Sequence, residues 1–146
     1  MSVTVFRHVG IVVQDMNAAV RFYKDWLGME VWADFVDNSE SVQAITAVPG
    51  ADIHMIKLRA PDGGSVELLK YRSHPQPVPV PKRACDTGVN HFALQVSDLD
   101  NLYRLLCSYG VYFHCPPAVS SDGGAKVTYC RDPEGVIVEL VEILKK

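Results

Sequence analysis

Two histidine–glutamate pairs occur at matching places in this 146-residue sequence, and both residue types bind metal ions and move protons in proteins. His8 begins the apolar stretch HVGIVV, and His91 begins the similar stretch HFALQV. Glu67 ends the run PDGGSVE and Glu139 ends PEGVIVE, with a proline six residues and a glycine four residues before each glutamate. A single histidine in an apolar strand is more often a hydrogen-bonded core residue than a ligand, and it is the repetition of the pair that favours a ligand role.

All four side chains belong to apolar strands, where an ionised group is costly unless it is paired. Two carboxylates in one cleft would each cost several kcal/mol if they were unpaired. A divalent cation removes that cost, and two neutral imidazoles complete its coordination shell. We therefore predict a metal site made of His8, Glu67, His91 and Glu139. For one pair alone a structural role is the better interpretation, and Glu139 could face solvent, as we expect for Glu142.

The elements that position these residues also repeat. In each copy an aspartate lies seven residues after the histidine and is suited to cap a helix, and a glycine is suited to end it. These residues are Asp15 and Gly28 in the first copy, and Asp98 and Gly110 in the second. Three β-rich runs follow each helix, namely MEVWADFV, DIHMIKLR and SVELLKYR, then VYFHC, AKVTYC and VIVELVEI. The sequence thus predicts an α+β fold of two βαβββ modules whose curled mixed sheets form a cleft.

The predicted boundaries follow from the repeat and from the prolines. The first module covers residues 1–72, the second covers 88–146, and a proline-rich linker occupies 73–87. The first copy is the longer one, and its additional residues fall in the segment DNSESVQAITAVPG.

Composition excludes several classes of function. The net charge of −3, with both signs mixed along the chain, predicts no nucleic-acid partner. The sequence lacks a signal-peptide pattern and any run of about 18 apolar residues, so we predict no membrane association. The cysteines (Cys85, Cys107, Cys115 and Cys130) are irregularly spaced, which is typical of reduced thiols in the cytoplasm.

The sequence resembles the vicinal oxygen chelate superfamily along almost its whole length. The resemblance is carried by FRHVGIVVQDMNAAVRFYKDWLGMEV, GVNHFALQVSDLDNLYRLL and CRDPEGVIVELVEI. The superfamily includes glyoxalase I, methylmalonyl-CoA epimerase, extradiol dioxygenases and bleomycin-binding proteins. In its metal-dependent members the ligands lie on the first and last strands of each module, which here are the positions of His8, Glu67, His91 and Glu139. The order of these four residues is most similar to bacterial glyoxalase I, because the epimerases usually have glutamine in place of Glu67.

This resemblance implies one divalent ion, nickel, cobalt, zinc or manganese rather than iron, and frequently a homodimer. It also implies proton transfer next to a carbonyl, of the glyoxalase lyase or acyl-CoA epimerase type, with Glu67 or Glu139 as the catalytic base. The substrate would be a small carbonyl compound or a thioester. Val12 and Tyr71 stand where glyoxalase I has the arginine and asparagine that hold glutathione, which argues against a glutathione substrate. Tyr71, Arg72 and His114 are candidates for substrate binding.

Two other functions remain open at the level of sequence. An iron(II) dioxygenase prefers two histidines and one carboxylate with open positions, so four protein ligands disfavour it. A non-catalytic protein that binds an antibiotic or another small molecule would need no metal ligands, whereas this sequence has four.

Overall fold

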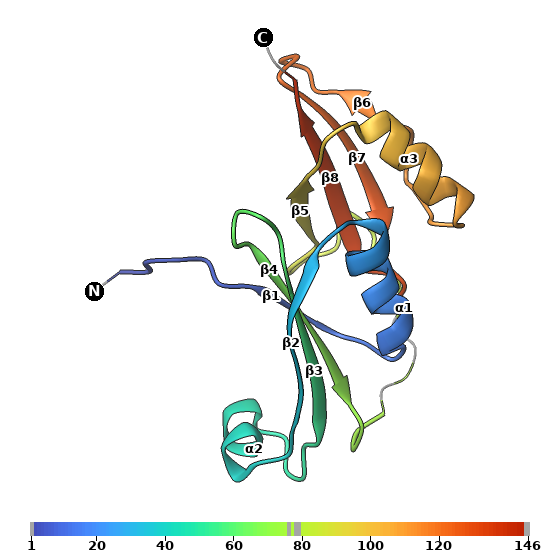
Figure 1. Ribbon diagram of the computed structural model, residues 1–146. Coiled ribbons are helices and arrows are strands. Elements are labelled where there is room, and N and C mark those ends of the chain that lie inside the picture. Colours follow the sequence, from blue (N-terminus) through green and yellow to red (C-terminus); the bar gives the residue numbers. More distant parts are fainter. Residues whose placement is uncertain (1, 76, 78–79, 145–146) are drawn as a thin grey trace. The chain divides into compact units, whose positions relative to one another are not determined.

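The computed structural model describes residues 2–75, 77 and 80–144, and the chain forms two compact units, Met1–Pro79 and Val80–Lys146 (Figure 1). Each unit contains one four-stranded mixed sheet, and neither sheet is closed. The predicted α+β class and the two related modules are therefore confirmed. Within the predicted linker 73–87, residues 76, 78 and 79 lie outside the described residues.

The first unit has the strand order β1-β4-β3-β2, in which β1 pairs with β4 in parallel and the other pairs are antiparallel. Its elements are β1 (Val9–Val12), α1 (Met16–Val20), the π-helical segment η1 (Arg21–Trp26), β2 (Glu30–Asp37), α2 (Glu40–Thr46), β3 (Ile53–Arg59) and β4 (Ser65–Tyr71). Because side chains alternate along a strand, Val66 and Leu68 lie on the face of β4 opposite Glu67. Both are buried, as are Ala19 and Phe22 of the helix, so this face holds the core.

The helix of the first unit begins and ends as its sequence predicts. The Asp15 carboxylate accepts a hydrogen bond from the Ala18 amide at 3.0 Å and so caps α1. Helix α1 continues without a break into η1, where the Leu27 amide donates to the Phe22 carbonyl five residues earlier. Gly28 follows with φ +76°, a left-handed conformation that glycine adopts without a side-chain penalty.

Helix α2 accounts for the extra length of the first module and lies in the segment predicted to hold it. The Ser39 hydroxyl caps the helix by accepting from the Val42 amide at 3.2 Å. Val42 packs with Ala51, Ile53 and Met55 in a small apolar cluster at one end of the sheet.

The second unit has the same topology, with the strand order β5-β8-β7-β6. Its elements are β5 (His91–Gln95), α3 (Leu99–Ser108), β6 (Ala118–Val119), β7 (Ala125–Arg131) and β8 (Ile137–Ile143). Asp98 caps α3 through the Asn101 amide, and Gly110 ends the helical region with φ +84°. Both residues therefore have the predicted roles.

Two expectations for the second unit are wrong. The run VYFHC forms no strand and makes only an isolated bridge between Phe113 and Cys130, because Pro116 and Pro117 follow it and cannot donate to a ladder. Glu142 does not simply face solvent. Its carboxylate accepts from the Leu99 amide at 3.1 Å, so it anchors the first turn of α3.

All four cysteines are free, and only Cys130 is buried. In the described part of the chain, no helix is long and apolar enough to cross a membrane.

Candidate metal centre

The first histidine–glutamate pair forms at the start of two parallel strands. His8 directly precedes β1 and Glu67 lies in β4, where it is opposite Gly10. His8 and Gly10 lie two residues apart and share a face of the sheet. The imidazole therefore lies beside the carboxylate, with Nε2 of His8 3.2 Å from Oε2 of Glu67. Glu67 is buried, with 9% of its surface exposed, as the sequence predicts.

The second pair repeats this arrangement in the second unit. His91 is the first residue of β5, and Glu139 lies in β8 opposite Ala93. Nε2 of His91 is 3.4 Å from Oε2 of Glu139. In both units the residue between histidine and glutamate on their shared face is small, either Gly10 or Ala93, so no large side chain separates the two polar groups.

The geometry of each pair suits two ligands of one cation. Bonds of about 2.0–2.2 Å from a zinc-sized ion, at tetrahedral or octahedral angles, place a ligand nitrogen and oxygen roughly 3.0–3.4 Å apart. The observed separations are 3.2 and 3.4 Å. The side chains of His8 and His91 are 42% and 36% exposed, so the imidazoles are more open to solvent than the sequence predicts.

Each unit contributes two of the four predicted ligands. Among the described residues of either unit, no group of three or more His, Cys, Asp or Glu side chains is assembled as a metal site. The four residues therefore form two separate pairs, one in each unit.

The structure adds one residue to each pair. Lys57 on β3 lies directly opposite Glu67, and its Nζ is 2.9 Å from Oε1. Tyr129 on β7 lies directly opposite Glu139, and its hydroxyl is 3.3 Å from Nε2 of His91. Each of these residues stands ten positions before the glutamate that it faces. Neither residue is among the predicted site residues, although the repeated ten-residue spacing is a sequence signal for both.

The two glutamates differ in how firmly they are held. The oxygens of Glu67 are divided between His8 and Lys57, so its carboxylate is fixed on both sides. In the described part of its own unit, Glu139 pairs with His91 alone. Glu139 is also the more exposed side chain, at 21% against 11% for Glu67.

Tyr129 and His114 have perturbed acidities. Burial, and then the negative charge of Glu139, raise the pKa of the Tyr129 phenol, so the hydroxyl keeps its proton. Burial, and then the positive charge of Arg131, lower the pKa of His114. The ring of His114 lies 5.9 Å from that of Tyr129, which itself lies 5.0 Å from that of His91.

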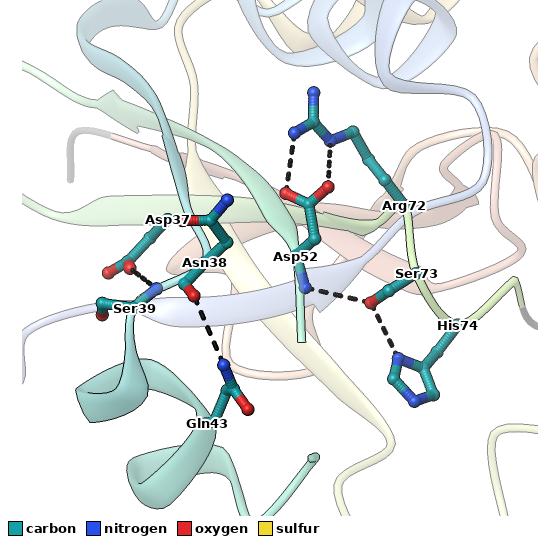
Figure 2. A network of polar contacts seen from close by, with 8 residues as sticks. All are labelled: Asp37, Asn38, Ser39, Gln43, Asp52, Arg72, Ser73 and His74. Atoms are coloured by element: carbon teal, nitrogen blue, oxygen red, sulfur yellow. Dashed lines mark hydrogen bonds and ion pairs between the residues drawn. The ribbon is translucent and has the colours of Figure 1, made fainter. Parts of the chain in front are cut away.

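The three predicted substrate-binding residues lie in different surroundings. The ring of His114 lies beside that of Tyr129, which in turn lies beside His91 of the second pair. Tyr71 packs against the apolar cluster that contains Val42. Arg72 is held by Asp52 in a two-pronged ion pair with distances of 2.7 and 3.1 Å, beside the Ser73–His74 contact (Figure 2).

Comparisons with known proteins are consistent with these features. Residues 7–142 match the Glyoxalase/Bleomycin resistance protein/Dioxygenase superfamily. The chain belongs to this superfamily.

Two curated relatives are similar over most of the chain. A 2-epi-5-epi-valiolone epimerase from Actinomyces sp. is 26% identical over 143 residues, which cover 93% of this chain and 78% of that protein. The uncharacterized protein YwbC of Bacillus subtilis (strain 168) is 24% identical and covers 92% of this chain and 94% of its own length.

Solved structures support the superfamily fold. A glyoxalase family protein from Bacillus cereus superposes with a TM-score of 0.91 at 20% identity, over 99% of this chain and 97% of that one. The trypanothione-dependent glyoxalase I of Leishmania major superposes with a TM-score of 0.67 at 21% identity, over 96% and 87% of the two chains. Enzymes with epimerase and glyoxalase activity are thus among the relatives of this superfamily member.

Proposed function

We propose that this protein is a metal-dependent enzyme that catalyses proton transfer next to a carbonyl, as an isomerase, an epimerase or a glyoxalase-type lyase. The observation that carries the proposal is the histidine–glutamate pair found at the same position in both units, at separations that suit a shared cation. Either separation would also fit an ordinary ion pair. The occurrence of both pairs in equivalent strands favours a common ligand.

The metal centre would consist of His8, Glu67, His91 and Glu139. Two imidazoles and two carboxylates suit zinc, nickel, cobalt or manganese, and two carboxylates balance the charge of a divalent ion. When bound, such an ion would polarise a substrate carbonyl and make the adjacent C–H bond more acidic.

Glu139 is the better candidate for the catalytic base. A base must leave its resting contacts to reach a carbon-bound proton, and Glu139 has one partner in its unit where Glu67 has two. The salt bridge to Lys57 keeps Glu67 in place as a ligand. This assignment gives different roles to two carboxylates that the sequence alone treats as equivalent.

Tyr129 would stabilise the charge that develops during proton transfer. Its hydroxyl lies at the second pair and keeps its proton because of its raised pKa. A phenol in this position can donate a hydrogen bond to a substrate oxygen as negative charge accumulates there. His114 lies one ring away and would help to shape the same side of the site.

Metal analysis followed by an isotope-exchange screen tests the proposal. Purified protein would be analysed for bound metals, then incubated in D₂O with α-keto aldehydes, cyclic ketones and thioesters while mass spectrometry follows deuterium incorporation. We expect about one zinc, nickel, cobalt or manganese ion per site, and deuterium at the carbon next to the carbonyl.

Other results would contradict the proposal. Bound iron together with oxygen consumption on catechols would indicate a dioxygenase. A protein that holds no divalent metal and still binds small molecules would indicate a binding function. Dimer formation stays a prediction that gel filtration with light scattering can test.

A further inference from the structure

A pocket of about 350 Å³ opens beside the His8–Glu67 pair, within the first unit. It lies between the segment that precedes β1 and strands β2 and β3. The described residues that line it are Val5, Phe6, Arg7, His8, Trp32, Lys57, Arg59, Gly63 and Ser65. Three of these side chains are cationic and none is a carboxylate.

The cations differ in how far neighbouring acids neutralise them. Arg59 is paired with Glu30 at 3.0 Å, and Lys57 is paired with Glu67 at 2.9 Å. Arg7 has no ion-pair partner among the described residues. The pocket therefore carries excess positive charge, and Arg7 can form a two-pronged contact with a carboxylate or a phosphate.

A break in the strand register brings an aromatic ring to the same pocket. The pairing of β2 with β3 shifts between Val31 and Ala33, so Trp32 is the extra residue of a β-bulge. The indole ring lies 5.7 Å from Nζ of Lys57, and Trp32 as a whole is 47% exposed. Bulges often redirect a side chain beside a binding site, and this one presents Trp32 to the cationic pocket.

We infer that this pocket binds an organic anion, a carboxylate or a phosphate on an apolar or planar body, as the anionic end of the substrate. The cations would hold the charge, and Trp32 with Phe6 would cover the apolar part. The position beside His8 would leave the other end of such a molecule at the metal ligands. The statement that the anion is part of the substrate rests on the proposed function. The presence of the anion site does not.

Nuclear magnetic resonance on the full chain in EDTA tests the site without any metal. The probes are benzoate and phenyl phosphate, with neutral benzamide as the control ligand. We expect saturable shifts of the Trp32 indole signal and of the backbone amides of Arg7 and Ser65, and no comparable shift of the Trp26 indole. Binding should weaken as sodium chloride is raised, because the contact is electrostatic. Saturation by either anion supports the site, and the tighter of the two identifies the preferred headgroup.

Two variants and one control variant test whether the chemical shift changes come from binding in the pocket. Arg7→Met and Lys57→Met should each raise the dissociation constant by roughly fivefold or more, the size expected for the loss of a charge-assisted contact. Lys24→Met removes an exposed lysine outside the pocket and should change nothing. Arg7 makes no ion pair with any residue that the structure describes, so Arg7→Met remains informative even if Lys57→Met unfolds the protein.

The inference is overturned if benzamide binds as well as benzoate, if neither anion saturates, or if Arg7→Met binds like the unmodified protein. Metal content and deuterium exchange are measured on separate samples. Loss of the proposed activity and loss of the anion site are therefore distinguishable outcomes.

Discussion

Lys57 and Glu67 face each other across β3 and β4, with Nζ and Oε1 2.9 Å apart, while the other carboxylate oxygen of Glu67 faces His8. The equivalent cross-strand position in the second unit holds Tyr129, which is uncharged. Two units with the same topology therefore hold their glutamates differently, one beside a cation and one beside a phenol. This difference leads to separate predictions for the two halves of the candidate centre.

Replacing Lys57 should destabilise the metal-free protein because Glu67 would keep a buried charge without its cation. We expect Lys57→Met to lower the free energy of unfolding by about 1–3 kcal/mol, measured by urea denaturation in EDTA at pH 7. The double variant Lys57→Met/Glu67→Gln should recover most of this loss, because it leaves no buried carboxylate that has lost its lysine.

Arg59 provides the matched control for Lys57. It lies two residues further along β3, and its ion pair with Glu30 is exposed on both sides. Arg59→Met should change stability by less than about 1 kcal/mol. Equal losses of unfolding free energy in Lys57→Met and Arg59→Met would show that the Lys57–Glu67 ion pair stabilises the fold no more than an exposed ion pair does.

Substituting the two glutamates one at a time should affect metal affinity and turnover to different extents. Under the proposed function, Glu67→Gln should weaken metal affinity more than Glu139→Gln, because Lys57 holds the Glu67 carboxylate on a second side whereas Glu139 has His91 as its one ion-pair partner in the described part of its unit. Glu139→Gln should abolish deuterium exchange even when enough metal is added to fill the site. Titration with a chromophoric chelator measures the first effect, and mass spectrometry measures the second.

Glu142→Gln is the control variant for Glu139→Gln, because it makes the same change of charge on β8. Glu142 lies on the opposite face from Glu139 and accepts from the Leu99 amide. Glu142→Gln should leave metal affinity and exchange unchanged and cost stability only. Loss of metal in this variant would refute the assignment of Glu139 as a ligand.

Much of the fold follows from local sequence signals. The caps at Asp15 and Asp98 and the glycines that end the helices could be predicted because each depends on a few neighbouring residues. The repeated histidine at the start of an apolar strand, and the repeated proline and glycine before Glu67 and Glu139, also predicted which strands carry the paired side chains. The VYFHC strand was wrong because β-rich composition favours pairing only where the chain can donate hydrogen bonds, and the two prolines that follow it cannot.

The partners of the site have a weaker sequence signal, which is the ten-residue spacing before each glutamate. Lys57 and Tyr129 meet the glutamates through antiparallel register, and register depends on turn geometry as well as on residue type. The bulge at Trp32 is a further example, because a one-residue insertion in a strand leaves no clear mark in the sequence. Arg72, a predicted substrate-binding residue, is held by Asp52 in the fold, and the sequence alone does not indicate this contact.

The cysteines should differ sharply in reactivity. Burial, and then the charge of Asp132, raise the pKa of the Cys130 thiol to about 12, so at pH 8 it remains protonated and unreactive. Cys85, Cys107 and Cys115 are exposed. We expect Ellman's reagent to titrate three thiols in the native protein and a fourth after denaturation. Four rapidly reacting thiols in the native state would contradict the burial of Cys130.

Tyr129→Phe tests whether the second unit contributes a hydrogen-bond donor to the reaction. The variant removes one hydroxyl and keeps the ring that packs between His91 and His114. We expect the rate of deuterium exchange to fall by about 10²-fold, the loss typical of removing one donor to a developing oxyanion, while metal content stays unchanged. Tyr112→Phe is the matched control, because Tyr112 also neighbours His114 but is 62% exposed and makes no contact with His91 among the described interactions. An unchanged exchange rate in Tyr129→Phe would leave Tyr129 a structural neighbour of His91, and the charge at the substrate oxygen would then be stabilised by the metal ligands and their cation alone.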